Sequence, residues 1–373
     1  MTDSLPVDER TQTLLQRYGF DPETFATLQK RLRQGEAGAE DNRIRGTVEP
    51  PAPGDVTPLP PLGSDARDML ARRGQQAIEA GEVGAVVLAG GMATRFGGVV
   101  KASVEALDGH SFLELKVRDA CSAAARAGGR VPIYLMTSFA TDAKIRELIE
   151  GLQSKPCPVE AFAQSISLRL EPNGEIFYGP DGNPSPYAPG HGDLTFALRR
   201  SGVLRRFREG GGKVLYMSNV DNATATLDPA VIGAHIEWGT AVTAEVAPKE
   251  EGDKGGAPAR VDGEPQVVES FRFPADFDPS SIPVFNVNSF VLDAEAIDRD
   301  FPLTWFSVTK TVGDREVIQF EHLVGELTAF LPTRFLRVER HGPDARFQPV
   351  KNPQELELRQ PEIRQALEAR GVL

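Results

Sequence analysis

A short, continuous apolar run, Val83 to Leu88, leads directly into a glycine-rich loop and constrains the fold more than any other feature of this chain. The run is far too short to span a membrane and lacks polar residues at alternate positions, so it predicts a strand that is buried on both faces. Comparable short runs follow at Pro132 to Met136, Val159 to Ala163 and Val214 to Met217. Strands of this kind are typical of parallel sheets.

The segments between these runs have features that are typical of helices. Ser111 to Glu114 has the spacing of a capping box and predicts a helix that continues to about Gly128. Further helices are expected from about Asp142 to Leu152 and over residues 193–208, the second closed by the glycines at 210–212. The alternation of strand and helix predicts an α/β fold with a doubly wound, mostly parallel sheet.

The two ends of the chain have a different character. Residues 1–45 predict two short helices, and the proline-rich residues 47–63 predict an extended connector without regular structure. The chain is therefore divided into a helical N-terminal segment with a Pro-rich connector (1–80), a central domain (81–300) and a small C-terminal lobe (301–373). The lobe is expected to end in a helix from Glu362 to Arg370.

Inside the central domain, the polar and glycine-rich residues 250–265 are expected to form a surface loop. The loop would join two antiparallel strands, Val242 to Ala247 and Gln266 to Ser270.

Composition limits the possible partners and location. The net charge is -12, and this acidic excess argues against nucleic acid or an anionic membrane as the main partner. The two cysteines, Cys121 and Cys157, form no C-x-x-C pair and are expected to be reduced thiols in the core. The first residues lack the basic start and apolar run of a signal peptide, so a cytoplasmic protein is expected.

The glycine-rich loop spans residues 88–101 and carries Gly90, Gly91, Arg95 and Lys101. Glycines let the backbone approach a ligand closely, free N–H groups bind phosphate, and the two cations add positive charge. The alternative is an ordinary tight turn. Neither G-x-G-x-x-G nor G-x-x-x-x-G-K-[ST] is present, which excludes the dehydrogenase dinucleotide motif and the P-loop.

This loop resembles the signature L-x-G-G-x-G-T-R-x-G, followed by a lysine, of the UTP–sugar-1-phosphate uridylyltransferases, the group of UDP-glucose and UDP-N-acetylhexosamine pyrophosphorylases. It departs from the signature at Ala93 and on both sides of Lys101, at Val100 and Ala102. The matching positions are Leu88, Gly90, Gly91, Thr94, Arg95, Gly97 and Lys101. Further short matches follow in family order over residues 84–352, at 136–138, 162–164, 188–193, 219–222, 267–269, 285–288, 310 and 346–351.

The resemblance implies a Rossmann-like sheet of the GT-A nucleotidyltransferase type, with nucleotide and sugar bound by residues 81–300. It implies an enzyme that joins UTP to a sugar 1-phosphate and releases pyrophosphate and a UDP-sugar, with Mg²⁺ as cofactor. The motifs at 285–289 and 346–351 look closest to the glucose type, so glucose 1-phosphate is expected, with the N-acetylglucosamine and galactose phosphates as alternatives. The eukaryotic glucose enzymes assemble through a long C-terminal β-helical region that this chain is too short to hold in full, so a monomer or dimer is expected.

The resemblance also assigns roles to residues. Arg95, Lys101 and Lys310 form the expected catalytic set, and Asp221, just after a strand, is expected to hold the metal ion. The alternative for Asp221 is an Asx turn that ends the strand. His191 is expected to position substrate and not to act as a general base, because a sugar phosphate is already ionised.

Two binding sets complete the expected site. Gln164 and the backbone of Gly91 are the candidates for reading uracil, because an amide matches its donor and acceptor edge. The expected nucleotide set is Leu88, Ala89, Gly90, Gly91, Gln164, Pro189, Gly190, His191, Gly192 and Asn219. The expected sugar and phosphate set is Glu269, Asn286, Asn288, Lys310 and Lys351. The alternatives are solvated side chains for Gln164, Glu269 and the two lysines, and turn chemistry for the two asparagines.

Two further functions remain open from the sequence. The same fold could serve as a UDP-sugar sensor without catalysis, although such a protein could lose Arg95, Lys101 or Asp221, and all three are present. A nucleotidyltransferase that uses another nucleoside triphosphate is the third possibility.

Overall fold

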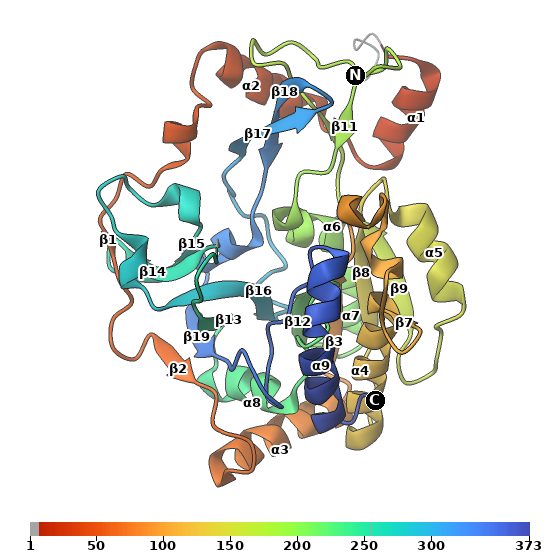
Figure 1. Ribbon diagram of the computed structural model, residues 1–373, viewed down its shortest axis with the longest axis vertical. Helices are drawn as coiled ribbons and strands as arrows, with labels where there is room; N and C mark the ends of the chain where they lie inside the picture. The colour runs from red at the N-terminus through yellow and green to blue at the C-terminus, as the bar shows by residue number, and fades with distance from the viewer. Residues whose placement is uncertain (1–6, 254) are drawn as a thin grey trace.

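The computed structural model describes residues 7–253 and 255–373, and a central eight-stranded sheet runs through the molecule (Figure 1). Neighbouring strands are parallel except at β16, which runs antiparallel to both of its neighbours. The prediction of an α/β fold with a mostly parallel sheet is therefore confirmed. In spatial order the strands are β2 (Val56–Pro58), β19 (Thr333–Arg337), β13 (Val242–Pro248), β16 (Val284–Asp293), β12 (Val214–Asn219), β3 (Val83–Leu88), β8 (Ile133–Thr137) and β9 (Val159–Ala163).

Helices cover both faces of the sheet because both faces are apolar. On β3, Ala85 and Val87 belong to one hydrophobic core and Val86 to another, as expected from the alternation of side chains along a strand. The first core packs under α3 (Asp65–Glu79), α4 (Phe112–Ala127), α5 (Asp142–Glu150), α8 (Pro229–Trp238) and α9 (Pro353–Ala369). The second packs under α6 (Leu194–Arg200) and α7 (Val203–Glu209).

The capping box predicted at Ser111 is present. Ser111 Oγ accepts a hydrogen bond from the Glu114 N–H at 3.2 Å, and the Glu114 carboxylate accepts one from the Ser111 N–H at 2.6 Å. At the other end of α4, Gly128 adopts φ 69°, a left-handed conformation that suits glycine. The predicted limits of this helix are thus confirmed.

One predicted helix is divided in two. Residues 193–208 form α6 and α7, preceded by a 3₁₀ turn, η4 (His191–Asp193). Gly202 has φ 72° between the two helices, and a left-handed residue cannot continue an α-helix. The prediction of one continuous helix was wrong because Gly202 was treated as a helical residue.

The prediction for residues 250–265 was also wrong. That segment contains β14 (Ala257–Val261), which pairs with β15 (Glu264–Val268), whereas β13 pairs with β16 and β19 in the central sheet. Asp262 and Gly263 have φ 51° and 86°, as a two-residue type I′ turn requires. The Asp-Gly pair is the hairpin signal that the prediction overlooked.

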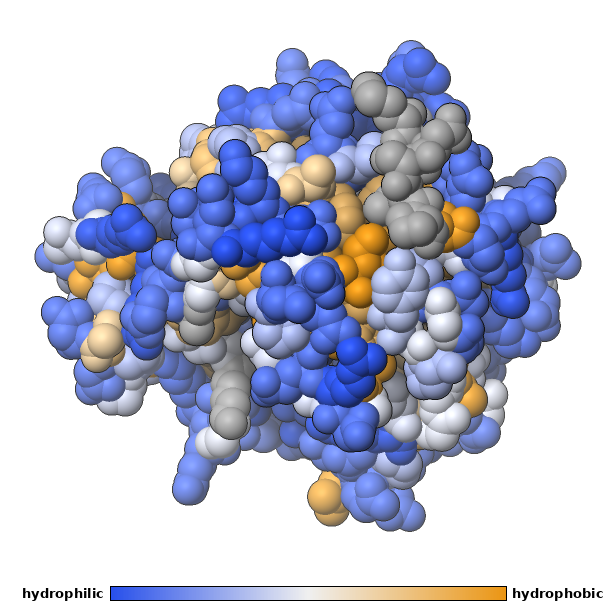
Figure 2. Space-filling model, turned by 90° about the horizontal axis from the view of Figure 1, so that it is seen from above, coloured by the Kyte–Doolittle hydropathy of each residue, from blue (hydrophilic) through white to orange (hydrophobic). Residues whose placement is uncertain are grey.

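The N-terminal helices are confirmed as α1 (Glu9–Arg17) and α2 (Pro22–Arg33). They pack on a third, smaller core with β10 (Ser167–Leu168) and the hairpin of β17 (Phe306–Val312) and β18 (Arg315–Glu321). Figure 2 looks down on this end of the molecule and shows mostly hydrophilic side chains, with apolar ones between them near the centre.

The connector at 47–63 contains two short strands, so the prediction that it lacks regular structure was wrong. β1 (Val48–Glu49) pairs with β14, and β2 forms an edge of the central sheet. Pro58 is tolerated in β2 because an edge strand leaves one side of its backbone unpaired. The last helix, α9, begins at Pro353 instead of Glu362. The three-part division stays a prediction, although β2 and β19 place both end segments in the central sheet.

The remaining elements are short. In the residues described, no helix combines the length and apolar character needed to cross a bilayer. The short strands are β4 (Met92–Ala93), β5 (Val99–Val100), β6 (Glu105–Leu107), β7 (His110–Ser111) and β11 (Pro186–Tyr187). The further 3₁₀ turns are η1 (Ala39–Asn42), η2 (Thr94–Phe96), η3 (Lys101–Ser103), η5 (Ser270–Arg272), η6 (Pro279–Ser281) and η7 (Val324–Ala329).

Candidate active site

The candidate site lies where the strand order of the sheet reverses. β3 and β12 are parallel neighbours, with Leu88 opposite Asn219 at their carboxyl ends. β8 and β9 continue the sheet beyond β3, whereas β16 and β13 continue it beyond β12. Open α/β sheets bind ligands at such a reversal, outside the carboxyl ends of the strands. The glycine-rich loop after β3 and the loop of Asp221 after β12 flank this point.

An ion pair joins these two loops. Lys101 Nζ donates to Asp221 Oδ2, and the two side chains are only 21% and 15% exposed. The Lys101 N–H also donates to the Gly91 carbonyl at 3.2 Å, which ties the cation to the glycine-rich loop. The structure thus brings together a predicted catalytic cation and the predicted metal ligand.

The glycine-rich loop itself is a small hairpin of β4 and β5. Gly97 and Gly98 have φ 83° and 79°, so the turn requires residues that tolerate the left-handed region. Arg95, on η2, is exposed and forms no ion pair with any residue that the structure describes.

Gly90 and Gln164 form a contact that could read uracil. A Cβ placed on Gly90 would lie 2.4 Å from Gln164 Nε2, so a larger residue there would have to displace the Gln164 amide. Gln164 is 5% exposed, and its Oε1 has no hydrogen-bond partner among the described residues. A buried acceptor without a partner is unfavourable, and a ligand N–H would relieve it. Ser138, which donates to the Gly90 carbonyl at 2.8 Å, supports the loop and was given no role from the sequence.

His191 is held as a neutral ring. Its Nδ1 accepts a hydrogen bond from the Val324 N–H at 3.1 Å, which leaves the ring proton on Nε2. Burial lowers the pKa of His191 to about 4, although the negative charge of Glu321 opposes this shift. A neutral Nε2–H can donate to a substrate oxygen, which agrees with the predicted positioning role.

The loop around His191 is fixed on two sides. The His322 N–H donates to the Pro189 carbonyl at 2.8 Å, and the Gly192 N–H donates to the His322 carbonyl at 3.0 Å. On the other side, the Asp193 carboxylate accepts from the Ser165 N–H at 2.6 Å. The position of the loop therefore depends on the end of β18 and on the segment after β9.

The predicted sugar residues form a continuous chain of contacts that starts at β12. Asn288 Nδ2 donates to Asn219 Oδ1 at 2.9 Å, and the Asn288 N–H donates to Asn286 Oδ1 at 3.1 Å. The Asn286 N–H donates to the Gly256 carbonyl at 2.7 Å, and the Glu269 carboxylate lies where a Cβ on Gly256 would be 3.0 Å away. Asn219, Asn286, Asn288 and Glu269 are thus brought together.

Glu269 has a cationic neighbour that the sequence did not reveal. Burial raises the pKa of Glu269, and the charge of Arg272 opposes that shift. Arg272 stacks over the Phe306 ring at 4.9 Å and lies 3.4 Å from Glu326. No motif singled out Arg272, and only its position three residues after Glu269 hinted at it.

The two remaining lysines are placed differently. Lys310, on β17, lies 3.5 Å from Glu321 at the end of β18 and is 47% exposed. It lines a hollow of about 810 Å³ together with Glu321, Arg43 and Phe271. Lys351 is exposed before α9, and its side chain forms no hydrogen bond or ion pair within the described part of the chain. Among the residues described, no contact joins Lys351 to Lys310.

Buried polar groups support the Asp221 loop from below. Asn222 Nδ2 donates to the Arg346 carbonyl at 3.0 Å, and the buried Arg346 side chain donates to the Thr226 carbonyl at 2.9 Å and to Glu245 at 2.6 Å. The buried Lys116 donates to the Ala225 carbonyl at 2.6 Å. The motif at 346–351 contained Arg346, but no role was predicted for this residue from the sequence.

Asp221 could hold Mg²⁺ only with help from a substrate. Residues 7–253 and 255–373 contain no group of three or more His, Cys, Asp or Glu residues arranged to hold a metal ion. Mg²⁺ commonly takes one or two carboxylates and completes its shell with phosphate oxygens and water. A lone carboxylate beside a loop that is predicted to bind phosphate fits that pattern.

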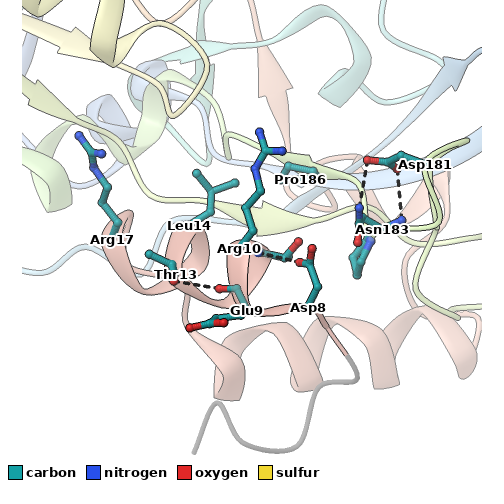
Figure 3. A pocket seen from close by; sticks show the side chains of 11 residues that line it. Asp8, Glu9, Arg10, Thr13, Leu14, Arg17, Asp181, Asn183 and Pro186 are labelled. Carbon is teal, nitrogen blue, oxygen red and sulfur yellow. Dashed lines mark hydrogen bonds between the residues drawn. The ribbon is translucent and has the colours of Figure 1, made fainter.

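A separate hollow of about 700 Å³ lies between α1 and residues 181–186 (Figure 3). The figure shows Arg10 and Arg17 on α1, with Asp181 and Asn183 across from them. None of the predicted site residues lines this hollow.

The fold is that of nucleotide-sugar pyrophosphorylases. A UDP-N-acetylglucosamine pyrophosphorylase of Trypanosoma brucei superposes with a TM-score of 0.73 at 21% identity, over 98% of this chain and 85% of that one. A UDP-glucose pyrophosphorylase variant of Leishmania major gives 0.70 at 22% identity, over 94% and 78%. At these identities the likeness establishes the fold alone.

The family described as UTP–glucose-1-phosphate uridylyltransferase matches residues 25–366, and this chain belongs to that family. Relatives bearing the name UTP–glucose-1-phosphate uridylyltransferase include one from Encephalitozoon cuniculi, 27% identical over 72% of this chain and 56% of the relative. One from Hordeum vulgare is 27% identical over 91% and 73%. The chain covers only 48% to 61% of the length of three of these relatives, from Encephalitozoon, Dictyostelium and Saccharomyces.

Proposed function

We propose that this chain is a uridylyltransferase that converts UTP and glucose 1-phosphate to UDP-glucose and pyrophosphate. The observation that carries the proposal is the joining of the two loops at the sheet reversal by Lys101 and Asp221. The contacts from Asn219 through Asn288 and Asn286 toward Glu269 support a sugar site next to the nucleotide site. We include in this proposal a Rossmann-like, GT-A type sheet, for which the parallel β12, β3, β8 and β9 are the support.

In the proposed reaction, a phosphate oxygen of the sugar 1-phosphate attacks the α-phosphorus of UTP in line. A new P–O bond forms, the bond from the α-phosphorus to the bridging oxygen breaks, and pyrophosphate leaves with the electron pair. Arg95 and Lys101 stabilise the negative charge on the leaving group, and Lys310 orients the attacking phosphate. No proton has to be removed, so the neutral His191 only donates a hydrogen bond.

Asp221 is the residue proposed to hold Mg²⁺, which when bound would neutralise charge on the phosphate oxygens. The hydrogen bond from Lys101 holds the Asp221 carboxylate in place before substrate arrives. On triphosphate binding, Lys101 would turn from Asp221 to the phosphates, and the freed Asp221 carboxylate would be the group that holds the metal ion.

The test is release of pyrophosphate with UTP, Mg²⁺ and a panel of glucose, galactose and N-acetylglucosamine 1-phosphates. Glucose 1-phosphate should give the highest kcat/KM, and ATP, GTP and CTP should each replace UTP poorly. Binding of UDP-glucose without any pyrophosphate release would support a sensor instead.

The same preparation, in light scattering, should show the proposed monomer or dimer. A cytoplasmic location also remains part of the proposal, supported by two free cysteines.

A further inference from the structure

A cavity separate from the candidate active site lies between α2, α6 and the chain that leads into β17. Its volume is about 470 Å³, within the range of small-molecule sites. We name it the α2–α6 cavity, after the helices labelled in Figure 1 that flank it. Its walls are aromatic, with Phe25 from α2, Phe196 from α6 and Trp305 before β17.

One polar side chain in this cavity lacks a partner. His322 lines the cavity and is only 4% exposed, yet its Nδ1 has no hydrogen-bond partner among the described residues. The ring packs against Trp305, with centroids 3.6 Å apart, and against Phe196 at 6.0 Å. A buried imidazole nitrogen without a partner is costly, and a ligand group that reaches the ring would remove the cost.

The charged side chains that line the cavity already form hydrogen bonds within the protein. Asp193 accepts from Ser165, Asp21 accepts from backbone N–H groups at the start of α2, and Arg200 donates to the Ala163 carbonyl at 2.8 Å. Asp21 and Arg200 are exposed, so the buried part of the cavity has no unbonded charged side chain among the described residues. The available interactions are aromatic stacking and one hydrogen bond to an imidazole.

The cavity shares a wall with the nucleotide loop. Pro189 and Asp193 line it, and the backbone of His322 bonds to both Pro189 and Gly192. A molecule bound against His322 would therefore affect the position of the loop that carries His191.

We propose that the α2–α6 cavity binds a small, uncharged, planar aromatic molecule with one hydrogen-bonding group, and that this ligand strengthens nucleotide binding by bracing residues 189–193. The coupling half of the proposal rests on the proposed function, whereas ligand binding does not.

Binding can be followed by the fluorescence of Trp305, because the chain has only one other tryptophan, Trp238. In the Trp238→Phe protein, benzamide should change the emission saturably with a Kd on the order of 1 mM, as expected for so small a ligand. Cyclohexanecarboxamide lacks the aromatic ring and toluene lacks the amide, so each should bind about fivefold more weakly or worse. A change that is linear in benzamide, or equal binding of the three probes, would overturn the proposal.

Two substitutions on α2 locate the site. Thr24→Phe, introduced into Trp238→Phe, fills the cavity from its rim and should abolish the benzamide response. Thr27→Phe makes the same change on an exposed position of the same helix and should leave the response intact. His322→Phe should weaken the binding of benzamide to about the affinity of toluene. A normal response in folded Thr24→Phe would place the binding elsewhere and refute the site.

Coupling is measured by titrating UTP with and without saturating benzamide. Benzamide should lower the Kd of UTP about fivefold, and UTP should lower the Kd of benzamide by the same factor, because linkage is reciprocal. Unchanged UTP affinity in a protein that binds both would refute the coupling. Failure to bind UTP at all would count against the proposed function. The benzamide titration would still test whether the cavity binds its ligand.

Discussion

The half-buried pair of Lys101 and Asp221 shows how much the surroundings of a single charge matter. A charge pair on an open surface contributes little, because water and salt screen it. Near the sheet reversal the two groups are largely shielded, so their attraction is stronger and their geometry is better defined. Removing either one should therefore affect chemistry more than removing an ordinary surface charge.

We expect Lys101→Ala and Lys310→Ala each to lower kcat by about 10²–10³, which corresponds to about 2.7–4 kcal/mol of transition-state stabilisation. The reason is the loss of one positive charge from the proposed phosphate site. Steady-state kinetics with pyrophosphate detection would measure the loss, and circular dichroism would check the fold. Lys144→Ala, which removes an exposed lysine on α5, is the matched control and should keep full activity. Wild-type turnover in Lys101→Ala or Lys310→Ala would remove that residue from the catalytic set.

Gln164 allows a different test at the same scale. Because its Oε1 has no partner among the described residues, Gln164→Met should not lower the free energy of unfolding. It should raise KM for UTP about two- to tenfold, the equivalent of one hydrogen bond of about 0.5–1.5 kcal/mol. A variant that loses stability but keeps its KM would show that Gln164 is structural.

At the scale of elements, buried ions tie several segments together. Arg346 is fully buried and bonds Glu245 on β13, Tyr216 on β12 and Thr226 in the Asp221 loop. The carbonyl of the same residue accepts from Asn222. The last part of the chain thereby fixes the loop that carries Asp221.

Arg346→Met should lower the free energy of unfolding by about 3–5 kcal/mol, because it leaves Glu245 buried without a cation. The double variant Arg346→Met with Glu245→Met should recover much of that loss, since no lone charge then remains. Urea denaturation would measure both. A double variant no more stable than the single one would mean that the ion pair is not the main source of the effect.

At the scale of the whole molecule, buried histidines make stability depend on pH. Burial lowers the pKa of His191, His235 and His322 to about 4 each, below the ordinary value of 6.5. Between these values the unfolded chain binds protons that the folded protein does not. The stability is therefore fully present above about pH 6.5 and falls as the pH drops toward 4.

His235→Gln should reduce the slope of unfolding free energy against pH between about pH 6 and 4.5 by up to about 1.4 kcal/mol per unit, the effect of one proton. His341→Gln is the control of opposite sign. Glu250 and Glu362 raise the pKa of His341, so its stabilisation is present at low pH and is lost as the pH rises through that pKa. Urea titrations at several pH values would compare the two. An unchanged slope in His235→Gln would show that this ring titrates normally in the folded protein.

Much of the fold could be predicted because its signals are local. The apolar runs of β3 and β9 and the capping box at Ser111 each lie within a few residues. The break at Gly202 and the Asp262-Gly263 turn were equally local but were missed. The glycine inside the predicted helix was treated as a helical residue, and the polar, glycine-rich stretch was treated as a surface loop.

The candidate site could be predicted less completely. The motifs named Lys101, Asp221, Gln164 and the asparagines, and the structure places several of them in contact. Arg272 and Lys116 escaped notice because a buried cation looks like a surface one until its neighbours are known. Lys351 shows the converse, since a motif match did not bring its side chain to Lys310.

The sequence by itself determined the alternating strands and helices, the chemistry of the glycine-rich loop and the family resemblance, because these depend on spacing along the chain. Only the tertiary structure decided that residues 56–58 and 333–337 pair in one sheet and that Arg346 supports the Asp221 loop. It also decided that His322 lines a cavity with an Nδ1 that has no hydrogen-bond partner in the part of the chain described. These features join segments far apart in the chain. Pairing, burial and desolvation depend on which surfaces finally meet, and spacing does not carry that information.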